Sequence, residues 1–154
     1  MKWFFPLLLF TTLPVFAASE DCRHDRKTFR CVKYVRNYDA DTITFNIPEV
    51  HPLLGDRIAV RVRHIDTPEI KGKAPCEKEA ARTAKRLIEN ILKRAQRIDL
   101  EDVGKDKYFR ILADVRVDGR LLSDVLMKNN LALAYEGKTK TKANWCQRSP
   151  AALE

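Results

Sequence analysis

The sequence predicts an α+β protein, mainly β, in which five strands form one small barrel with two to three helices packed on it. Five short segments alternate β-branched or aromatic residues with polar ones, which is the pattern of half-buried strands. One longer segment repeats its apolar residues at helical spacing. The 154 residues are 45% hydrophobic, which suits a single core. A five-stranded sheet that curls on itself would remove its exposed edges.

Residues 1–18 predict a secretory signal that is cleaved. Lys2 is a short positive start, Trp3–Phe16 is almost wholly apolar, and Val15–Ala17 offers small residues for cleavage. An uncleaved anchor is the weaker alternative, because the apolar run is shorter than the roughly 20 residues that span a bilayer. We therefore expect a secreted or periplasmic protein without a stable membrane anchor.

Four cysteines suit an exported protein with two disulfides, since an oxidising compartment lets such bonds persist. The sequence does not determine the pairing. We favour Cys22 with Cys31, which closes a small loop, and Cys76 with Cys146, which ties the chain end to the middle. A zinc site is the alternative, but no two cysteines have the close spacing of zinc ligands. The expected organisation is a signal (1–18), a disulfide-linked extension (19–31), one domain (32–146) and a tail (147–154).

The first two strands are expected to form an antiparallel pair. Apolar and charged side chains alternate from Phe29 to Val35, and β-branched and aromatic residues fill Thr42–Ile47. The segment Asn37–Asp41 would connect them tightly. Two prolines and a glycine then predict a loop over Pro48–Asp56.

A third strand is expected over Arg57–Ile65. Strand alternation places Val60, Val62 and His64 on one face of this strand. It places Arg61, Arg63 and Ile65 on the opposite face. We interpret His64 as a packed or partly exposed strand residue rather than a ligand.

The clearest helix follows. Its apolar residues recur at helical spacing: Ala80, Ala84, Leu87, Ile88, Ile91 and Ala95. The basic opposite face is interpreted as a solvated surface in preference to a nucleic-acid contact. After this helix we expect a short strand over Arg97–Glu101 and a flexible polar loop over Asp102–Lys107. A further strand over Arg110–Val117 and a second helix over Leu121–Lys128 follow. In the last strand, alternation places Arg110 on the face away from the core.

The chain is basic, with 29 Lys and Arg against 21 Asp and Glu and a net charge of +8. Such a charge attracts polyanions, including nucleic acid. It is also common in exported proteins without such a partner, so charge alone does not identify the function.

Carboxylates near two strand ends could meet on folding. Asp41 lies in the first tight connection, and Asp66 and Glu69 follow the third strand. Pro68 holds Thr67 extended, so the Thr67 carbonyl could turn toward the same point. Such an all-oxygen set suits a hard cation such as calcium or magnesium. The alternative is that these acids only cap turns and pair with arginines.

Two arginines complete a set of groups for phosphodiester chemistry. Arg61 and Arg110 each stand on a strand face opposite the apolar face, and an arginine fork matches two phosphate oxygens. A metal and two arginines around a phosphodiester would neutralise the charge that builds during in-line displacement, while a carboxylate activates water.

Four short motifs occur in order: Asp39-Ala-Asp-Thr42, Arg61 leading to Asp66-Thr-Pro-Glu69, Asp106-Lys-Tyr-Phe-Arg110 and Asp118-Gly-Arg120. In order and spacing they resemble the staphylococcal nuclease (thermonuclease) family over approximately residues 32–135. The resemblance implies an OB-fold and a calcium-dependent nuclease that cleaves DNA and RNA with little sequence preference, leaving 3′-phosphate ends. Magnesium and manganese are the less favoured metals, and we expect a monomer.

The resemblance also implies a role for each matching residue. Calcium would be held by Asp41, Asp66 and the Thr67 carbonyl, and the phosphate would be bound by Arg61 and Arg110. Glu69 would act on the attacking water. Substrate contacts would come from Lys107, Tyr108 and Tyr135.

Three departures from the family pattern stand out. Ala40 replaces a usual glycine, which would matter only if this position needs a positive φ angle. Phe109 replaces the glycine that usually precedes the second arginine, so the entry to that strand could differ. The family's long terminal helix is missing from the pattern, and Trp145 and Cys146 could take over its packing role.

Two other functions remain open from the sequence. One is a non-catalytic OB-fold module that binds single-stranded nucleic acid through basic and aromatic residues. Such a binder would gain nothing from three acids beside its ligand. The other is an envelope protein in which the fold serves only as a scaffold for protein contacts.

Overall fold

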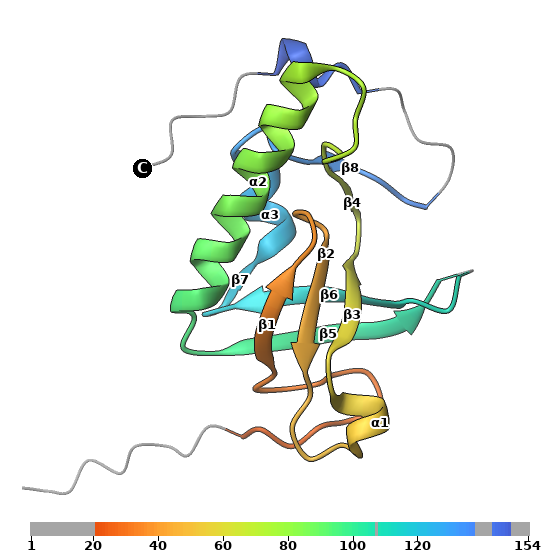
Figure 1. Ribbon diagram of the computed structural model, residues 1–154. Coiled ribbons are helices and arrows are strands. Elements are labelled where there is room, and N and C mark those ends of the chain that lie inside the picture. The colour runs from red at the N-terminus through yellow and green to blue at the C-terminus, as the bar shows by residue number, and fades with distance from the viewer. Residues whose placement is uncertain (1–20, 107, 138–142, 149–154) are drawn as a thin grey trace, which may run out of the picture.

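The computed structural model describes residues 21–106, 108–137 and 143–148, and the expected signal lies outside them. Its main sheet has the strand order β1-β2-β3-β6-β5, with short β7 beside β6 (Figure 1). The strands are β1 (Lys33–Asn37), β2 (Thr42–Asn46), β3 (Ile58–Val62), β5 (Ile98–Lys105), β6 (Ile111–Val117) and β7 (Arg120–Leu121). A second small sheet pairs β4 (Ile65–Asp66) with β8 (Leu133–Ala134). The helices are α1 (Pro52–Gly55), α2 (Pro75–Arg94) and α3 (Leu122–Lys128), with the 3-10 turn η1 (Trp145–Gln147).

The alternation of apolar residues builds the core between the sheet and the two longer helices. Ile43 and Phe45 on β2 and Val115 on β6 are fully shielded, and Ile88 on α2 packs into the same cluster. All strand pairs in the main sheet are antiparallel except β3 with β6. The predicted α+β class, with five principal strands in an OB-type arrangement, is confirmed.

The chain before β1 joins the first strand to β5. Phe29 and Leu100 exchange backbone hydrogen bonds of 2.9 and 2.7 Å, and the Val32 N–H donates to the Ile98 carbonyl at 2.9 Å. Cys31, with φ of 55°, interrupts the extended backbone between them. The predicted strand from Phe29 is therefore divided: its first part pairs with β5, and only the part from Lys33 pairs with β2.

The prediction of one continuous strand to Ile65 is wrong. The strand β3 ends at Val62, and a turn at residues 63–64 places His64 at φ of 60°. This turn reverses the alternation, so that Ile65 is buried and His64 is half exposed. The chain then resumes as β4, where the His64 carbonyl accepts a 2.9 Å hydrogen bond from the Tyr135 N–H.

Two predicted loops contain regular structure. The segment Pro48–Asp56 includes the single turn α1. The expected flexible loop after Glu101 is instead strand, because β5 continues to Lys105 after a bulge near Asp102, whose φ is 44°. The resulting β5–β6 hairpin reaches beyond the rest of the sheet (Figure 1).

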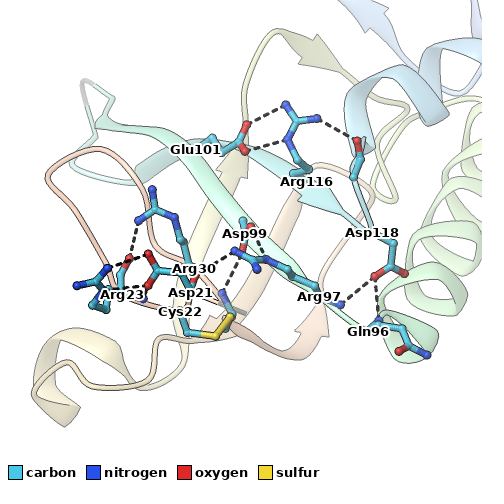
Figure 2. Close-up of polar contacts among 12 residues, drawn as sticks. Asp21, Cys22, Arg23, Arg30, Gln96, Arg97, Asp99, Glu101, Arg116 and Asp118 are labelled. Atoms are coloured by element: carbon cyan, nitrogen blue, oxygen red, sulfur yellow. Dashed lines mark hydrogen bonds and ion pairs between the residues drawn. A yellow bond between two sulfur atoms is a disulfide. The ribbon is translucent and has the colours of Figure 1, made fainter. Parts of the chain in front are cut away.

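Both favoured disulfides are present. The Cα atoms are 5.4 Å apart in Cys22–Cys31 and 5.2 Å apart in Cys76–Cys146, and no cysteine is left for zinc. Asp99 on β5 fixes the first disulfide, because its carboxylate accepts from the Cys31 N–H at 2.8 Å and from Arg97 Nε at 2.8 Å (Figure 2).

The C-terminal part of the described chain packs without a long helix. η1 lies against α2, and Trp145 within it is buried. The adjacent Cys146 is bonded to Cys76 at the start of α2. Among residues 21–106, 108–137 and 143–148, no helix has the length and apolar character needed to cross a bilayer.

Candidate active site

Arg61 reaches the site from the end of β3. Because Val60 and Val62 face the core, the side chain of Arg61 points to the other side of the sheet. It is nevertheless only 12% exposed. Its Nη1 lies 2.6 Å from Asp41 Oδ2, and its Nη2 donates to the Ile65 carbonyl at 3.0 Å and lies 3.8 Å from Asp66 Oδ1. The guanidinium is therefore fixed by groups from β4 and from the β1–β2 connection.

Asp41 is held in place by its own backbone and by two hydroxyl groups. Its carbonyl accepts from the Val62 N–H at 2.8 Å, which ties the β1–β2 connection to β3. Its carboxylate accepts from Thr67 Oγ1 at 2.8 Å and from Thr42 Oγ1 at 3.2 Å. Burial raises the pKa of Asp41 to about 6, and the charge of Arg61 opposes that rise. Asp41 is thus a preorganised acceptor in a site of restricted solvent access.

The turn after β4 carries the remaining acids. Pairing of Asp66 with Leu133 on β8 sets the start of this turn, and Thr67 and Pro68 within it are buried. Glu69 is exposed, and its backbone is fixed because its carbonyl accepts from the Gly72 N–H at 2.9 Å. Asp41 and Asp66 therefore meet at one guanidinium, while Glu69 stands farther out on the surface.

The donor set matches a hard cation in chemical type. Asp41 and Asp66 would supply carboxylate oxygens and the Thr67 carbonyl a third oxygen, which is the type of ligand that calcium and magnesium prefer. Within the described part of the chain, no three His, Cys, Asp or Glu side chains gather as a metal-ligand cluster. A cation held here would therefore need a backbone carbonyl beside the two carboxylates, both of which lie within ion-pair distance of Arg61.

Arg110 is held by a different device at the tip of the β5–β6 hairpin. Asp106 Oδ1 accepts from the N–H groups of Tyr108 and Arg110 at 2.7 and 2.9 Å, and Asp106 Oδ2 accepts from Arg110 Nε at 2.7 Å. Burial opposes ionisation of Asp106, but these hydrogen bonds prevail and lower its pKa. As alternation predicts, Arg110 faces away from the core, and it is 46% exposed.

A pocket of about 360 Å³ brings the two arginines together. Arg61 and Arg110 both line it, as do Tyr108 and Tyr135. The pairing of β3 beside β6 accounts for this, because Arg61 lies opposite Leu112 in the parallel register. Lys107 lies outside the described residues. The acids predicted for the metal are not among the residues that line this pocket.

The other residues that line the pocket include three polar side chains to which the sequence assigned no role in the site: Arg63, His64 and Glu136. His64 Nδ1 lies 3.6 Å from Glu136 Oε1, and Arg63 Nε donates to the Asp102 carbonyl at 2.9 Å. The positive φ of His64 turns its side chain out of the core-facing row. Strand alternation alone could not place His64 in the pocket. The short sequence distance from Arg61 to Arg63 and His64 was nevertheless a signal that the two residues could lie near the site.

The two glycine replacements have opposite outcomes. Ala40 is buried and does not have a positive φ, so the position does not require glycine. Phe109 has φ of 61° and is 84% exposed, so a bulky residue occupies a conformation that favours glycine.

The family model described as "Staphylococcal nuclease homologue" matches residues 59–151. The chain is also 35% identical over 113 residues to the SPbeta prophage-derived endonuclease YokF of Bacillus subtilis (strain 168). That similarity covers 70% of this chain and 35% of YokF, so the chain spans about a third of the length of that relative. The family match includes Arg61, Asp66, Glu69 and Arg110, whereas Asp41 lies before it.

Proposed function

The chain belongs to the staphylococcal nuclease homologue family, and on that premise we propose that it is a secreted, calcium-dependent nuclease that hydrolyses DNA and RNA with little sequence preference. One observation carries the proposal. Arg61 and Arg110, from separate parts of the sheet, line one pocket, and Arg61 is in contact with both Asp41 and Asp66. A phosphodiester in this pocket would meet two guanidinium groups beside an acidic oxygen set.

The two arginines would bind the phosphate and stabilise charge on its oxygens. A guanidinium offers paired donors, and a fixed donor needs no reorganisation as charge develops on the phosphoryl group. Arg61 is fixed in this way by Asp41 and by the Ile65 carbonyl. Arg110 has more solvent around it and would close on the opposite side of the phosphate.

The acids would bind the metal ion and activate the attacking water. Asp41, Asp66 and the Thr67 carbonyl would hold calcium, with magnesium or manganese as less favoured ions. Calcium bound there would supply Lewis-acid stabilisation of the phosphoryl oxygen. Glu69, on the exposed turn that follows, would accept a proton from the attacking water.

Aromatic residues of the pocket would contact the nucleotide. Tyr108 and Tyr135 both line it and present rings on which a base or sugar can pack. Lys107, which precedes Tyr108, would add a contact to a terminal phosphate.

The protein would act as an exported monomer. Two disulfides suit an oxidising compartment, and the excess of Lys and Arg over Asp and Glu suits a nucleic-acid substrate. Cleavage of the signal would leave it in the periplasm or outside the cell.

Replacement of Asp41 tests the proposal. Asp41→Ala should abolish calcium-stimulated cleavage, because it removes a metal ligand and leaves Arg61 without its 2.6 Å partner. The measurement is digestion of single-stranded DNA, duplex DNA and RNA with calcium, with magnesium and with chelator. Asp56→Ala at the exposed end of α1 is the matched control. Asp41→Asn, which keeps the volume, separates lost chemistry from lost folding.

Two results would contradict the proposal. Unchanged calcium-stimulated cleavage by Asp41→Asn would remove Asp41 from the metal site. Binding of nucleic acid by the wild-type protein without cleavage under any condition would favour the non-catalytic OB-fold binding module. The acids grouped around Arg61 argue for the enzyme, since a polyanion binder gains nothing from them.

A further inference from the structure

Glu77 lies in the first turn of α2 and reaches back to the turn that carries Glu69, between β4 and α2 (Figure 1). The N-cap residue of this helix, Ala74, makes no side-chain capping hydrogen bond. A glutamate three residues after an N-cap commonly reaches back to the N-cap N–H. Here the Glu77 carboxylate accepts from the N–H of Glu69, eight residues earlier, at 3.4 Å. Glu77 thus makes a contact that serves the turn and not only its own helix.

Two hydrogen bonds fix the backbone on both sides of the Glu69 Cα. Its N–H donates to Glu77 Oε1, and its carbonyl accepts from the Gly72 N–H at 2.9 Å. The preceding residue, Pro68, is buried. Because the Glu69 side chain itself is exposed, the orientation of this backbone decides which region its carboxylate can reach.

Gly72 makes room for the Glu77 carboxylate. A Cβ atom on Gly72 would lie 2.4 Å from Glu77 Cδ and 2.5 Å from Glu77 Oε2, closer than side-chain atoms approach one another. Gly72 does not have a positive φ, so its backbone angle does not require glycine. The missing side chain at this position therefore lets Glu77 approach the turn.

The start of α2 is held by a distant part of the chain. Cys76, next to Glu77, is bonded to Cys146, and η1 around Cys146 lies against α2. Trp145 in η1 is buried, and Glu77 is half-buried. Glu77 therefore projects from an anchored helix end, which lets it fix the turn opposite.

We propose that Glu77 is a positioning residue for Glu69, so that the carboxylate that would act on the attacking water is aimed from the first turn of α2. A general base works only within hydrogen-bond reach of the proton that it accepts. A misplacement of about 1 Å costs on the order of 100-fold in rate. The inference rests on the proposed nuclease function and adds to its site a residue that does not touch the substrate.

A purely structural role for Glu77 makes a different demand on its side chain. An acid in the first turn stabilises a helix through its charge, because the helix N-terminus is electropositive. Positioning of Glu69 needs only an oxygen that accepts from the Glu69 N–H. Glutamine keeps such an oxygen and loses the charge. Glu77→Gln therefore separates the two roles.

The first test measures kcat and KM for cleavage of an oligothymidylate with calcium, below the melting temperature of every variant. Glu77→Ala should lower kcat by about 10- to 100-fold and change KM by less than about twofold, because Glu69 would act on water and not hold the substrate. Glu77→Gln should keep kcat within about threefold of wild type. The control is Glu79→Ala, which removes an exposed acid of α2 that pairs with Arg82 at 3.1 Å, and it should cleave like wild type.

Gly72→Ala tests the same contact while Glu77 stays in place. The added Cβ should displace the Glu77 carboxylate, so kcat should fall as it does in Glu77→Ala. In the double variant the clashing atoms of Glu77 are absent, so adding Gly72→Ala to Glu77→Ala should cost less than about twofold more. An unchanged kcat in Gly72→Ala, or losses that multiply in the double variant, would contradict the proposal.

Amide hydrogen exchange at Glu69, measured by NMR, gives a readout that does not depend on cleavage. Exchange should be about 3- to 10-fold faster in Glu77→Ala and in Gly72→Ala, and unchanged in Glu77→Gln and Glu79→Ala. Unchanged exchange in Glu77→Ala would overturn the proposal. An equal fall of kcat in Glu77→Gln and Glu77→Ala would overturn it too, because the charge of Glu77 would then act directly. A lower melting temperature of Glu77→Ala with unchanged kcat would assign Glu77 to the helix alone.

The exchange result stands apart from the proposed hydrolysis. Wild-type protein that cleaves nothing with calcium contradicts the nuclease function, and the exchange rates at Glu69 still decide whether Glu77 holds the turn. Cleavage by wild type together with an unchanged kcat in Glu77→Ala contradicts only the role of Glu77.

Discussion

Arg61 on β3 is 12% exposed and contacts groups from two other segments of the chain, whereas Arg110 at the β5–β6 hairpin is 46% exposed and is held by a carboxylate four residues before it. The partners of Arg61 include Asp41, 20 residues earlier in the sequence, and the Ile65 carbonyl beyond a turn. One half of the candidate site is thus assembled by the fold. The other half is a local hydrogen-bonded turn.

This difference predicts different consequences of mutation. Removing one partner of a buried ion pair leaves an uncompensated charge and costs about 3–5 kcal/mol, whereas an exposed pair contributes about 0–1 kcal/mol. Changes around Arg61 should therefore affect both folding and cleavage. Changes around Arg110 should affect cleavage while the folded state is nearly unchanged.

The largest effect on the cleavage rate in this comparison is expected for Arg61→Lys. Lysine keeps the charge, but a single ammonium cannot reach Asp41 and the Ile65 carbonyl and also present paired donors to a phosphate. We expect cleavage to slow by roughly 100- to 1000-fold and the free energy of unfolding to fall by about 1–3 kcal/mol. Single-turnover cleavage of an oligonucleotide and urea denaturation measure the two quantities.

Arg120→Lys on β7 is the matched control, because Arg120 is exposed and lies outside the pocket. It should change neither quantity measurably. A near-normal cleavage rate for Arg61→Lys would remove Arg61 from the catalytic assignment.

A smaller effect on cleavage, together with a larger effect on stability, is expected for the disulfide next to the Arg61 half. Cys76–Cys146 closes a separation of 70 residues and fixes the start of α2, just after the turn that carries Glu69. Its replacement by two serines should lower the free energy of unfolding by about 4 kcal/mol and should slow cleavage. Cys22–Cys31 has a separation of only 9, so its replacement should cost about 2.5 kcal/mol.

Urea denaturation of the two double-serine variants makes this comparison directly. Equal losses of stability, or a larger loss for Cys22–Cys31, would contradict the prediction that Cys76–Cys146 contributes more to stability because it closes the longer loop. The Cys22–Cys31 variant should cleave at the wild-type rate, since Asp99 still accepts from the N–H of residue 31 and Arg97 still donates to the Asp21 carbonyl (Figure 2).

The smallest effect on stability is expected for Asp106→Asn. The amide keeps one oxygen for the backbone N–H groups, but its NH2 cannot accept from Arg110 Nε. Cleavage should slow by roughly 10-fold because Arg110 loses its orientation, while the free energy of unfolding falls by less than about 1 kcal/mol. A loss of stability as large as that of Arg61→Lys would show that the two halves are built alike after all.

Much of the fold could be predicted from local sequence patterns. Alternating Ile43 and Phe45, and the helical spacing of Ala84 and Ile88, identified core-facing residues correctly because burial has the period of the element. Alternation failed at His64, where one left-handed residue reversed the faces. It also missed the second half of β5, whose polar residues are stabilised by pairing with β6 rather than by burial.

The sequence by itself determined the class of fold, the ordered motifs and the chemical type of each candidate site group. These follow from residue identity and from local periodicity, which the chain carries wherever it folds. Only the tertiary structure decided that Asp41 lies against Arg61, that Arg61 and Arg110 share a pocket, and that Ala40 is unstrained while Phe109 is strained. Those facts depend on strand register and on single backbone angles, because a turn of one or two residues redirects every side chain that follows.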